Sequence, residues 1–405
     1  MENVNYKKLN RSINIYPIFY GLTADLIFWI AIDTLFLTTV KNLSASQINS
    51  IDAISTIVGI IFQIILVKIV RKIGNLNSVK LGVTLLFVSV LLNTISTNYI
   101  GFLIAELCYV IGFVFKHMDN VILIKNLKYL NRSEEYINYQ TKGSTIYSLI
   151  TLFISIISGF MFNINPYIPM IICLLVCFIN IILTNFIYEV PISFDESEVI
   201  ESNYTKNNFS KKIILMIILY GLFYAMIGCG QKNSKLFIQF DLQNFLKIDK
   251  VAIYMSTFIF ISRISRLLSN LLFLKIYNRY KEKMLYIFEF GLVLAFISLL
   301  IGHFIGSIYG VYIMALGFFM FLFIRDPFDN FMRKTLFENS SEKVHDKIVN
   351  YINLTRKIFT LIYSTIVSSM LIKLNYVYVM PLLLILSISF IVIIYKVYRL
   401  VREKK

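Results

Sequence analysis

Long apolar blocks, separated by short basic or polar stretches, run through the whole sequence and constrain its fold more than any other feature. An α-helix needs about 20 residues to cross the hydrocarbon core of a bilayer. Backbone polar groups find no water there, and continuous apolar runs rather than ten-residue alternation favour helices over a barrel. We therefore predict an all-α polytopic membrane protein with twelve spans, at residues 15–39, 46–67, 80–97, 100–124, 143–162, 167–187, 213–237, 251–274, 284–303, 306–324, 351–371 and 377–395.

Composition and charge agree with a membrane protein. Of the 405 residues, 58% are hydrophobic and 15% are charged, whereas soluble domains carry about 25% charged residues. The net charge of +16 would fit nucleic-acid binding, but the basic residues lie at the ends of the apolar blocks, so no nucleic-acid partner is expected. With both termini in the cytoplasm, the outer loops hold only Lys41, Lys247, Lys250 and Lys373. This bias predicts the orientation of a multi-pass protein, and the frequent Ile, Asn, Lys and Tyr residues favour a bacterial plasma membrane.

Residues typical of cofactor or enzyme sites are scarce. All four cysteines lie inside predicted spans, without the His and Cys companions of a metal site. With three histidines and no His-His or Cys-rich cluster, we expect no enzyme activity, no metal and no cofactor. No Gly-x4-Gly-Lys-Ser/Thr phosphate loop occurs.

An internal repeat divides the chain into two similar halves. The matching segments are Ile18–Leu22 with Ile218–Leu222, Lys68–Ile73 with Lys275–Tyr280, and Lys116–Asn120 with Asp326–Asn330. Six spans separate the copies, so both halves have the same orientation in the membrane. We expect an N-terminal six-helix bundle over residues 1–188, a polar cytoplasmic linker over 189–212 and a C-terminal six-helix bundle over 213–405.

Taken together, the parallel six-helix halves, the central linker and the basic loops after spans 2 and 8 resemble the major facilitator superfamily over nearly the whole chain. That family's loop signature is Gly-x-x-x-Asp-Arg/Lys-x-Gly-Arg/Lys. In the matching stretch, Lys72 and Gly74 fit, whereas Val67 replaces the first glycine and Arg71 the acidic residue. The resemblance implies a secondary transporter whose spans 1, 4, 7 and 10 line a central cavity.

Ionisable side chains gather on those four spans and on span 8, which is informative because a charge inside the bilayer is costly. Asp25 lies near mid-membrane without a cation three or four residues away, and desolvation there would favour the neutral acid. We therefore expect Asp25 and Asp33 to couple transport to a proton or other cation, a static ion pair being the alternative for Asp25. The substrate-cavity candidates are Trp29, Glu106, Gln231, Lys232, Lys235, Arg263 and Arg266.

The spacing of the charges predicts two layers of contacts between the halves. Lys116/Asp119, Lys232/Lys235, Arg263/Arg266 and Asp326/Asp329 are i,i+3 pairs that project from one helix face. In the outer layer, Asp33 would contact Lys232 or Lys235. The inner layer, a cytoplasmic gate, would contain Lys116, Asp119, Arg325, Asp326, Asp329 and Arg356. The alternative for Arg325, Asp326 and Asp329 is that they cap the cytoplasmic end of span 10.

The favoured function is a monomeric secondary active transporter that moves a small solute by alternating access, coupled to a proton or another ion. Paired cations on spans 7 and 8 favour an amphipathic or anionic solute. The alternatives are a drug or peptide efflux pump of the same fold, a lipid-linked saccharide flippase, or a sensor that has lost transport.

Overall fold

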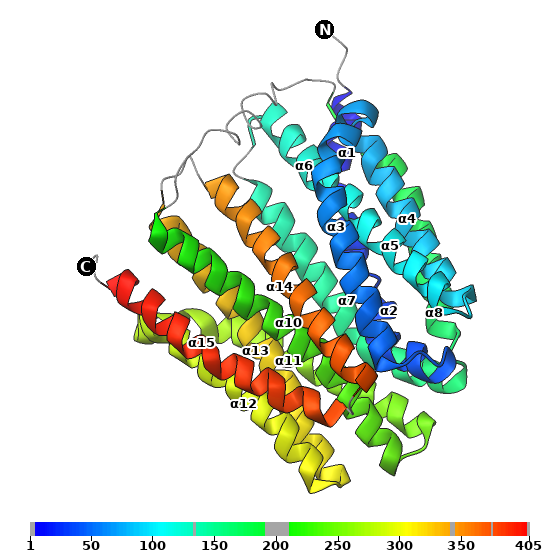
Figure 1. Cartoon of the computed structure of the whole chain (residues 1–405). Helices are drawn as coiled ribbons and strands as arrows, with labels where there is room; N and C mark the ends of the chain where they lie inside the picture. Colours follow the sequence, from blue (N-terminus) through cyan, green and yellow to red (C-terminus); the bar gives the residue numbers. More distant parts are fainter. Residues whose placement is uncertain (1–4, 133–134, 191–209, 341–344, 374–375, 403–405) are drawn as a thin grey trace. The chain divides into compact units, whose positions relative to one another are not determined.

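The computed structural model describes residues 5–132, 135–190, 210–340, 345–373 and 376–402, and the regular elements in these ranges are helices (Figure 1). The elements of the first half are α1 (Tyr6–Thr23), α2 (Trp29–Leu35), η1 (Phe36–Val40), α3 (Ala45–Ile73), α4 (Asn75–Ile95), α5 (Tyr99–Lys116), α6 (Met118–Tyr129), α7 (Tyr136–Ile164), α8 (Ile168–Leu183) and η3 (Thr184–Phe186). Those of the second half are α10 (Lys211–Phe245), α11 (Ile248–Tyr280), η4 (Lys281–Lys283), α12 (Met284–Ile305), α13 (Ile308–Glu338), α14 (His345–Lys373), η6 (Tyr376–Tyr378) and α15 (Val379–Arg402).

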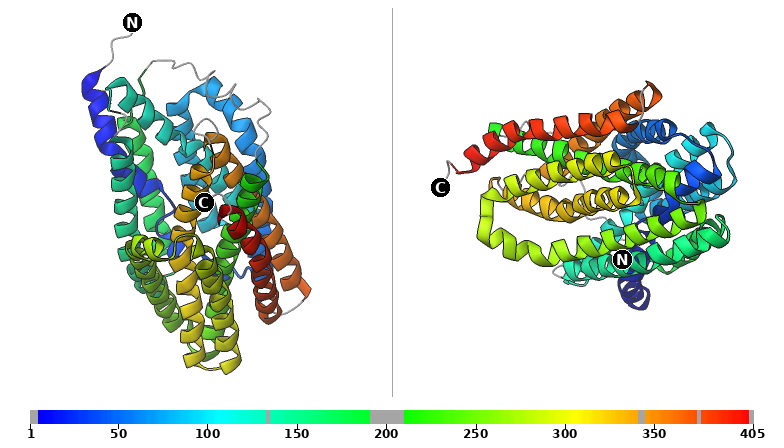
Figure 2. Two further views of the ribbon diagram at one scale, coloured as in Figure 1. Left: turned by 90° about the vertical axis from the view of Figure 1, so that its left-hand side faces the viewer. Right: turned by 90° about the horizontal axis from the view of Figure 1, so that it is seen from below.

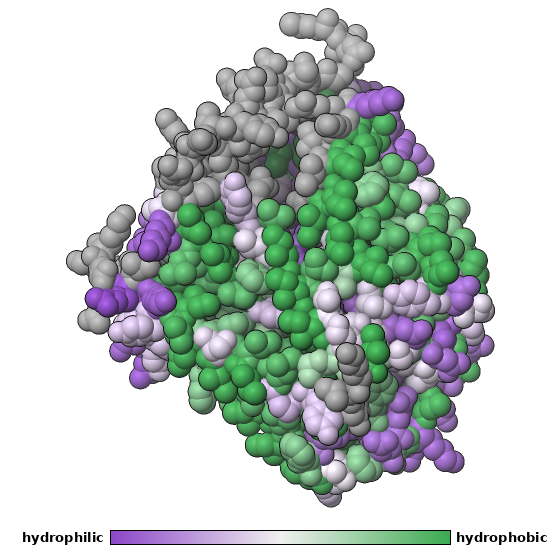
Figure 3. All heavy atoms as spheres, viewed as in Figure 1, coloured by the Kyte–Doolittle hydropathy of each residue, from purple (hydrophilic) through white to green (hydrophobic). Residues whose placement is uncertain are grey.

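Helical structure covers each of the twelve expected spans, and the all-α membrane fold is confirmed. Ten helices among the described residues are long and apolar enough to cross a bilayer. The spans that fall below that measure are the first, which is divided into α1, α2 and η1, and the eleventh, α14, which carries Arg356 and Lys357. Apolar side chains cover much of the helices' visible surface, and hydrophilic ones gather mainly near helix ends (Figure 3).

The helices form two compact units. Unit 1 comprises Met1–Leu43 and Ile54–Glu196, and unit 2 comprises Ser44–Ala53 and Ser197–Lys405. Within each unit the helices lie side by side (Figure 2). The start of α3, which the sequence places in the N-terminal half, is thus grouped with the second unit. Of the expected linker 189–212, residues 191–209 lie outside the described residues.

Corresponding helices pack in the same pairs in the two units. In unit 1 these pairs are α1 with α7, α4 with α5 and α4 with α8; in unit 2 they are α10 with α14, α12 with α13 and α12 with α15. The repeated glycines explain the first of these contacts. A Cβ on Gly21 would lie 2.5 Å from Ile146 of α7, and one on Gly221 would lie 2.8 Å from Thr355 of α14. The Tyr-Gly repeat in the sequence therefore marks a repeated helix contact.

The first span is interrupted at residues 24–28, which the sequence analysis did not expect. Asp25 Oδ1 accepts a hydrogen bond from the backbone N–H of Leu26 (2.8 Å), a local contact that competes with helical hydrogen bonding. At the end of α1, the carbonyl of Leu22 accepts a hydrogen bond from the side chain of Asn180 on α8 (3.1 Å). The side chain of Asn180, which is 3% exposed, thus satisfies a carbonyl that the break releases from the helix.

Glu189, in the chain that leaves the sixth span, contacts the start of α4 and also α6. Glu189 accepts hydrogen bonds from the side chain of Asn75 (2.6 Å) and the N–H of Leu76 (3.2 Å), and its carboxylate lies 3.2 Å from Lys125 Nζ. Since the first N–H groups of a helix lack partners, this carboxylate caps α4.

In the loop between α6 and α7, the Arg132 guanidinium donates two hydrogen bonds to the Glu135 carboxylate. This contact holds the pKa of Glu135 below its ordinary value.

Candidate functional site

Asp25 lies in the interruption of span 1, between the end of α1 and the start of α2. Its Oδ1 atom accepts a hydrogen bond from the hydroxyl of Tyr109 on α5, at 2.9 Å. The Tyr109 ring lies edge-on against Phe113, with centroids 4.7 Å apart. Asp25 itself is half-buried. A carboxyl group at a break in a membrane helix, held by a phenol from the fourth span, can accept and release a proton.

Three other candidates of spans 1 and 4 lie on α2, which follows the break, and on α5. Trp29 is the first residue of α2, and its ring packs edge-on against Phe36 at 6.1 Å. Asp33 lies on the same helix, where its carboxylate accepts from the N–H of Thr34 at 2.7 Å. Glu106 lies on α5 about one turn before Tyr109 and is half-buried. Trp29 and Asp33 therefore lie on the helix that follows the break, and Glu106 lies on the helix whose Tyr109 binds Asp25.

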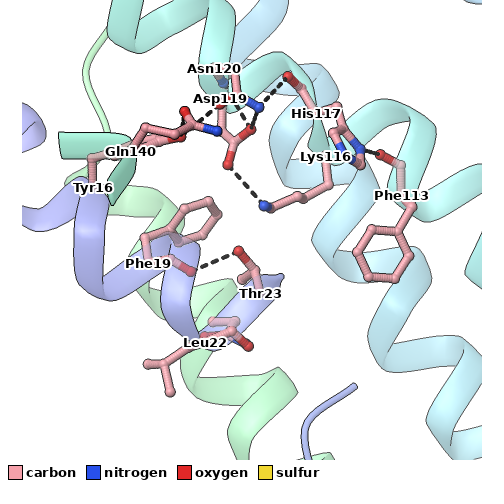
Figure 4. A network of polar contacts seen from close by, with 11 residues as sticks. Tyr16, Phe19, Leu22, Thr23, Phe113, Lys116, His117, Asp119, Asn120 and Gln140 are labelled. Carbon is pink, nitrogen blue, oxygen red and sulfur yellow. Dashed lines mark hydrogen bonds and ion pairs between the residues drawn. The ribbon is translucent and has the colours of Figure 1, made fainter. Parts of the chain in front are cut away.

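A buried polar cluster joins α1 to the junction between α5 and α6 (Figure 4). Lys116 and Asp119 form an ion pair of 3.0 Å with side chains 2% and 1% exposed. The ammonium of Lys116 also lies 4.7 Å from the ring centre of Tyr20. Tyr16 donates to Asn120 (2.7 Å) and to Gln140 (3.4 Å). The i,i+3 spacing correctly predicted that Lys116 and Asp119 share a face.

In unit 2, Lys232 of α10 forms an ion pair with Asp52 at the start of α3. The sequence analysis did not single out Asp52; it proposed that Asp33 contacts Lys232 or Lys235, which stays a prediction. The neighbouring amides also meet, with Asn49 Nδ2 3.2 Å from Asn233 Oδ1. Lys235, one turn further along α10, is 7% exposed. Asn49 and Asp52 thus join the α10 candidates in one polar cluster.

The acids of span 10 bind cations of their own unit. Arg266 of α11 donates to Asp326 at 2.6 Å, and Asn270 donates to the same oxygen at 3.2 Å. Asp329 accepts from Arg333 at 2.7 Å and from the hydroxyl of Tyr220. Asp326 and Asp329 therefore connect α13 with α11 and α10, respectively. Arg263 lies one turn before Arg266 and is half-buried.

Two further arginines meet around one tyrosine of α10. Arg325 of α13 donates to the hydroxyl of Tyr224 (3.1 Å) and to Oε1 of Gln231 (3.2 Å). The guanidinium carbons of Arg325 and Arg356 lie 5.6 Å and 5.3 Å from the centre of the Tyr224 ring. Arg356 belongs to α14, so three helices contribute. The sequence assigned Arg325 and Arg356 to a cytoplasmic gate and Gln231 to the cavity, whereas the structure brings them together.

The loop signature forms the turn between α3 and α4. Gly74 has φ +82°, a left-handed conformation that favours glycine, and Lys72 is exposed. The side chain of Arg71 lies outside the described residues. The cap on α4 comes from Glu189, which is far from the signature in sequence.

Sequence reasoning missed the neutral polar residues that complete these clusters, chiefly Tyr16, Tyr109, Asn180 and Tyr224. An isolated asparagine within the apolar sixth span was a usable signal, because a buried amide requires hydrogen-bond partners. The tyrosines offered no comparable signal, since the chain contains 26 of them.

Two units with the same helix pairings define a multi-pass membrane protein with the fold of the major facilitator superfamily. By sequence, no family model and no curated protein matches the chain. By structure, it is similar to the nucleoside transporter NupG, with a TM-score of 0.73 at 12% identity, covering 98% of this chain and 100% of that one.

Two other solved transporters have the same fold. A bacterial homologue of the iron transporter ferroportin, in an inward-facing state, matches with a TM-score of 0.68 at 14% identity over 98% of this chain and 100% of its own. A bacterial homologue of the human lysosomal transporter Spinster matches with a TM-score of 0.64 at 11% identity over 98% of this chain and 96% of its own. At identities this low, the structural similarity establishes the fold alone.

Proposed function

We propose that this protein is a secondary active transporter that moves a small solute across the cell membrane by alternating access, driven by a proton gradient. The observation that carries the proposal is the break in span 1, which places the Asp25 carboxylate against Tyr109 of span 4. Discontinuous membrane helices recur in transporters, where they form substrate and ion sites near mid-membrane. Irregular backbone at that depth is tolerated where it is buried in protein or lines a cavity.

In this proposal each group at the break has one task. Asp25 binds the coupling proton, and Tyr109 donates a hydrogen bond that orients its carboxyl group. Asn180 holds the open end of α1 and keeps the break in place. The similarity in fold to transporters of nucleosides and iron supports transport as the function. The proposed halves are residues 1–188 and 213–405, joined by the linker 189–212.

The test is solute uptake into proteoliposomes across a panel of metabolites and drugs, with and without an imposed pH gradient. Asp25→Asn should abolish gradient-driven accumulation, because the amide cannot bind a proton, while exchange of solute between the two sides continues. Asp249→Asn is the matched control, since Asp249 is an exposed acid in the first turn of α11. Accumulation that is independent of the gradient and unchanged in Asp25→Asn would falsify proton coupling.

Two further assays, drug resistance of cells and translocation of a labelled lipid, separate the proposal from its alternatives. A drug or peptide exporter of this fold would move drugs out of cells and confer resistance. A lipid-linked saccharide flippase would translocate a labelled lipid and no water-soluble solute. A protein that moves no solute in either direction, with or without a gradient, would contradict transport altogether.

A further inference from the structure

We infer that a groove between α11 and α13 binds one acyl chain of an anionic phospholipid, whose phosphate group is held by Lys247 and Lys250. The residues that form this lipid site all belong to unit 2. The site is independent of the transported solute and of the coupling ion.

The groove lies between two helices that run in the same direction. The rings of Tyr254 and Tyr312 lie 6.2 Å apart, and those of Phe258 and Phe319 also lie 6.2 Å apart. These pairs follow the same order along both helices, so α11 and α13 begin at the same end of the unit. In the predicted topology this is the outer end.

The size of the groove fits an acyl chain. Its lining side chains lie between positions 253 and 261 of α11 and between 312 and 319 of α13, and its volume is about 540 Å³. Over that length α11 rises about 12 Å, and one leaflet contributes roughly 15 Å to the hydrocarbon core. A chain in the groove is contacted on two sides, whereas a flat helix surface contacts it on one, so dispersion favours the groove.

The open side of the groove has the surface expected toward hydrocarbon. Ile261 and Leu316 line the groove and are 38% and 56% exposed. Further along the same face of α11, Leu268 and Leu272 are exposed as well. The wall of a water-filled cavity would carry polar groups at these positions, whereas contiguous exposed apolar side chains mark contact with a membrane.

Two lysines lie at the start of α11, on the face that lines the groove. Lys247 is the N-cap residue of α11, Lys250 lies in its first turn, and both are exposed. One helix face carries positions 247, 250, 254, 257 and 261, because steps of three or four residues keep side chains on one side. The acid of the first turn, Asp249, lies one residue from Lys250 and so about 100° around the helix.

The order of groups along the groove matches the order of groups in a phospholipid. The two ammonium groups come first and attract a phosphate at the membrane surface. Tyr254 and Tyr312 follow, with the amphipathic rings that favour the membrane interface. Ile261 and Leu316 come last and contact the chain. A zwitterionic lipid balances its phosphate with its own amine, so it gains less from the lysines.

Native mass spectrometry of the full-length chain in a neutral detergent tests this site, with dioleoyl phosphatidylglycerol and dioleoyl phosphatidylcholine as the probes. The two lipids have the same acyl chains and differ in net charge. Phosphatidylglycerol should bind with the lower Kd. The double variant Lys247→Gln with Lys250→Gln should weaken its binding by about 5- to 30-fold and leave phosphatidylcholine binding nearly unchanged.

The matched control for charge is the double variant Lys281→Gln with Lys283→Gln. These exposed lysines belong to η4, which follows the opposite end of α11. The control removes the same net charge from the chain. Phosphatidylglycerol binding should be unchanged in it.

A tryptophan that fills the groove tests the seat of the acyl chain. Thr257 lines the groove and is exposed, so Thr257→Trp should weaken the binding of both lipids by about tenfold or more, the equivalent of two or more buried methylene groups. Leu271→Trp is the control, because Leu271 is exposed on α11 outside the groove. The Tm of each variant without lipid checks its folding, and Leu316→Trp fills the groove from the other wall if Thr257→Trp lowers that Tm.

Three results would overturn the lipid site. The first is equal affinity for the two lipids, or an equal loss of affinity when either lysine pair is replaced. The second is equal binding by the groove-filling variant and Leu271→Trp. The third is a chain that retains no lipid and forms dimers that Thr257→Trp dissociates, which would assign the groove to a second copy of the chain.

Discussion

Several ion pairs between charged side chains of the helices join residues of one compact unit. Lys116 holds Asp119, and Arg266 holds Asp326. Spacing along one helix could predict the first pair, because residues three apart share a face. It could not predict the second, which joins two helices, because helix rotation and rotamer choice decide such partners. Lys232 illustrates the difficulty, since spacing along the helices gave no reason to pair it with Asp52 of α3.

At the same scale, the ion pair between Asp52 and Lys232 should contribute measurably to stability. Their side chains are 29% and 28% exposed, so removing either charge leaves the other partly desolvated. Asp52→Ala or Lys232→Ala should lower the free energy of unfolding by about 1–3 kcal/mol, measured as a fall in Tm in detergent. The double swap Asp52→Lys with Lys232→Asp should recover part of the loss. If the swap is no better than the worse single variant, the pair contributes little.

At the scale of the helices, two features determine the packing: the places where two backbones approach closely, and the place where a helix is interrupted. Glycines mark the close contacts, and the Tyr-Gly repeat of spans 1 and 7 was visible in the sequence. The break at residues 24–28 was not, because no glycine or proline lies within it and Asp25 looked like one more polar residue in a span. In the structure, hydrogen bonds accompany the break: Leu26 and Tyr109 donate to Asp25, and Asn180 donates to the carbonyl of Leu22. No pattern in the sequence indicated these contacts.

A second prediction about stability tests helix packing at Gly302 of α12, with Gly228 of α10 as the control. A Cβ on Gly302 would lie 2.4 Å from the carbonyl oxygen of Gly310, a backbone atom that cannot move aside cheaply. Gly302→Ala should therefore destabilise the protein by about 1–3 kcal/mol, seen as a lower Tm. Gly228→Ala is the control, because a Cβ there would meet nothing within 4 Å. An equal loss in both variants would contradict an effect of packing.

At the scale of the whole molecule, the distribution of lysine and arginine predicts both termini in the cytoplasm. Cysteine labelling tests this orientation. Lys250→Cys, at the exposed start of α11, should react with a membrane-impermeant maleimide in intact cells, whereas Asn278→Cys, at the exposed end of the same helix, should react only after permeabilisation. The native cysteines give little background, since three are buried and Cys108 is half-buried. The reverse labelling pattern would invert the topology.

The amino-acid sequence by itself determined the membrane class, the approximate positions of the spans and the twofold repeat, because hydropathy and turn residues act locally along the chain. Only the tertiary structure decided which charges meet, where span 1 breaks and that two arginines share the Tyr224 ring. Those outcomes depend on the rotation and packing of helices distant in sequence, where a shift of one residue turns a side chain by about 100°.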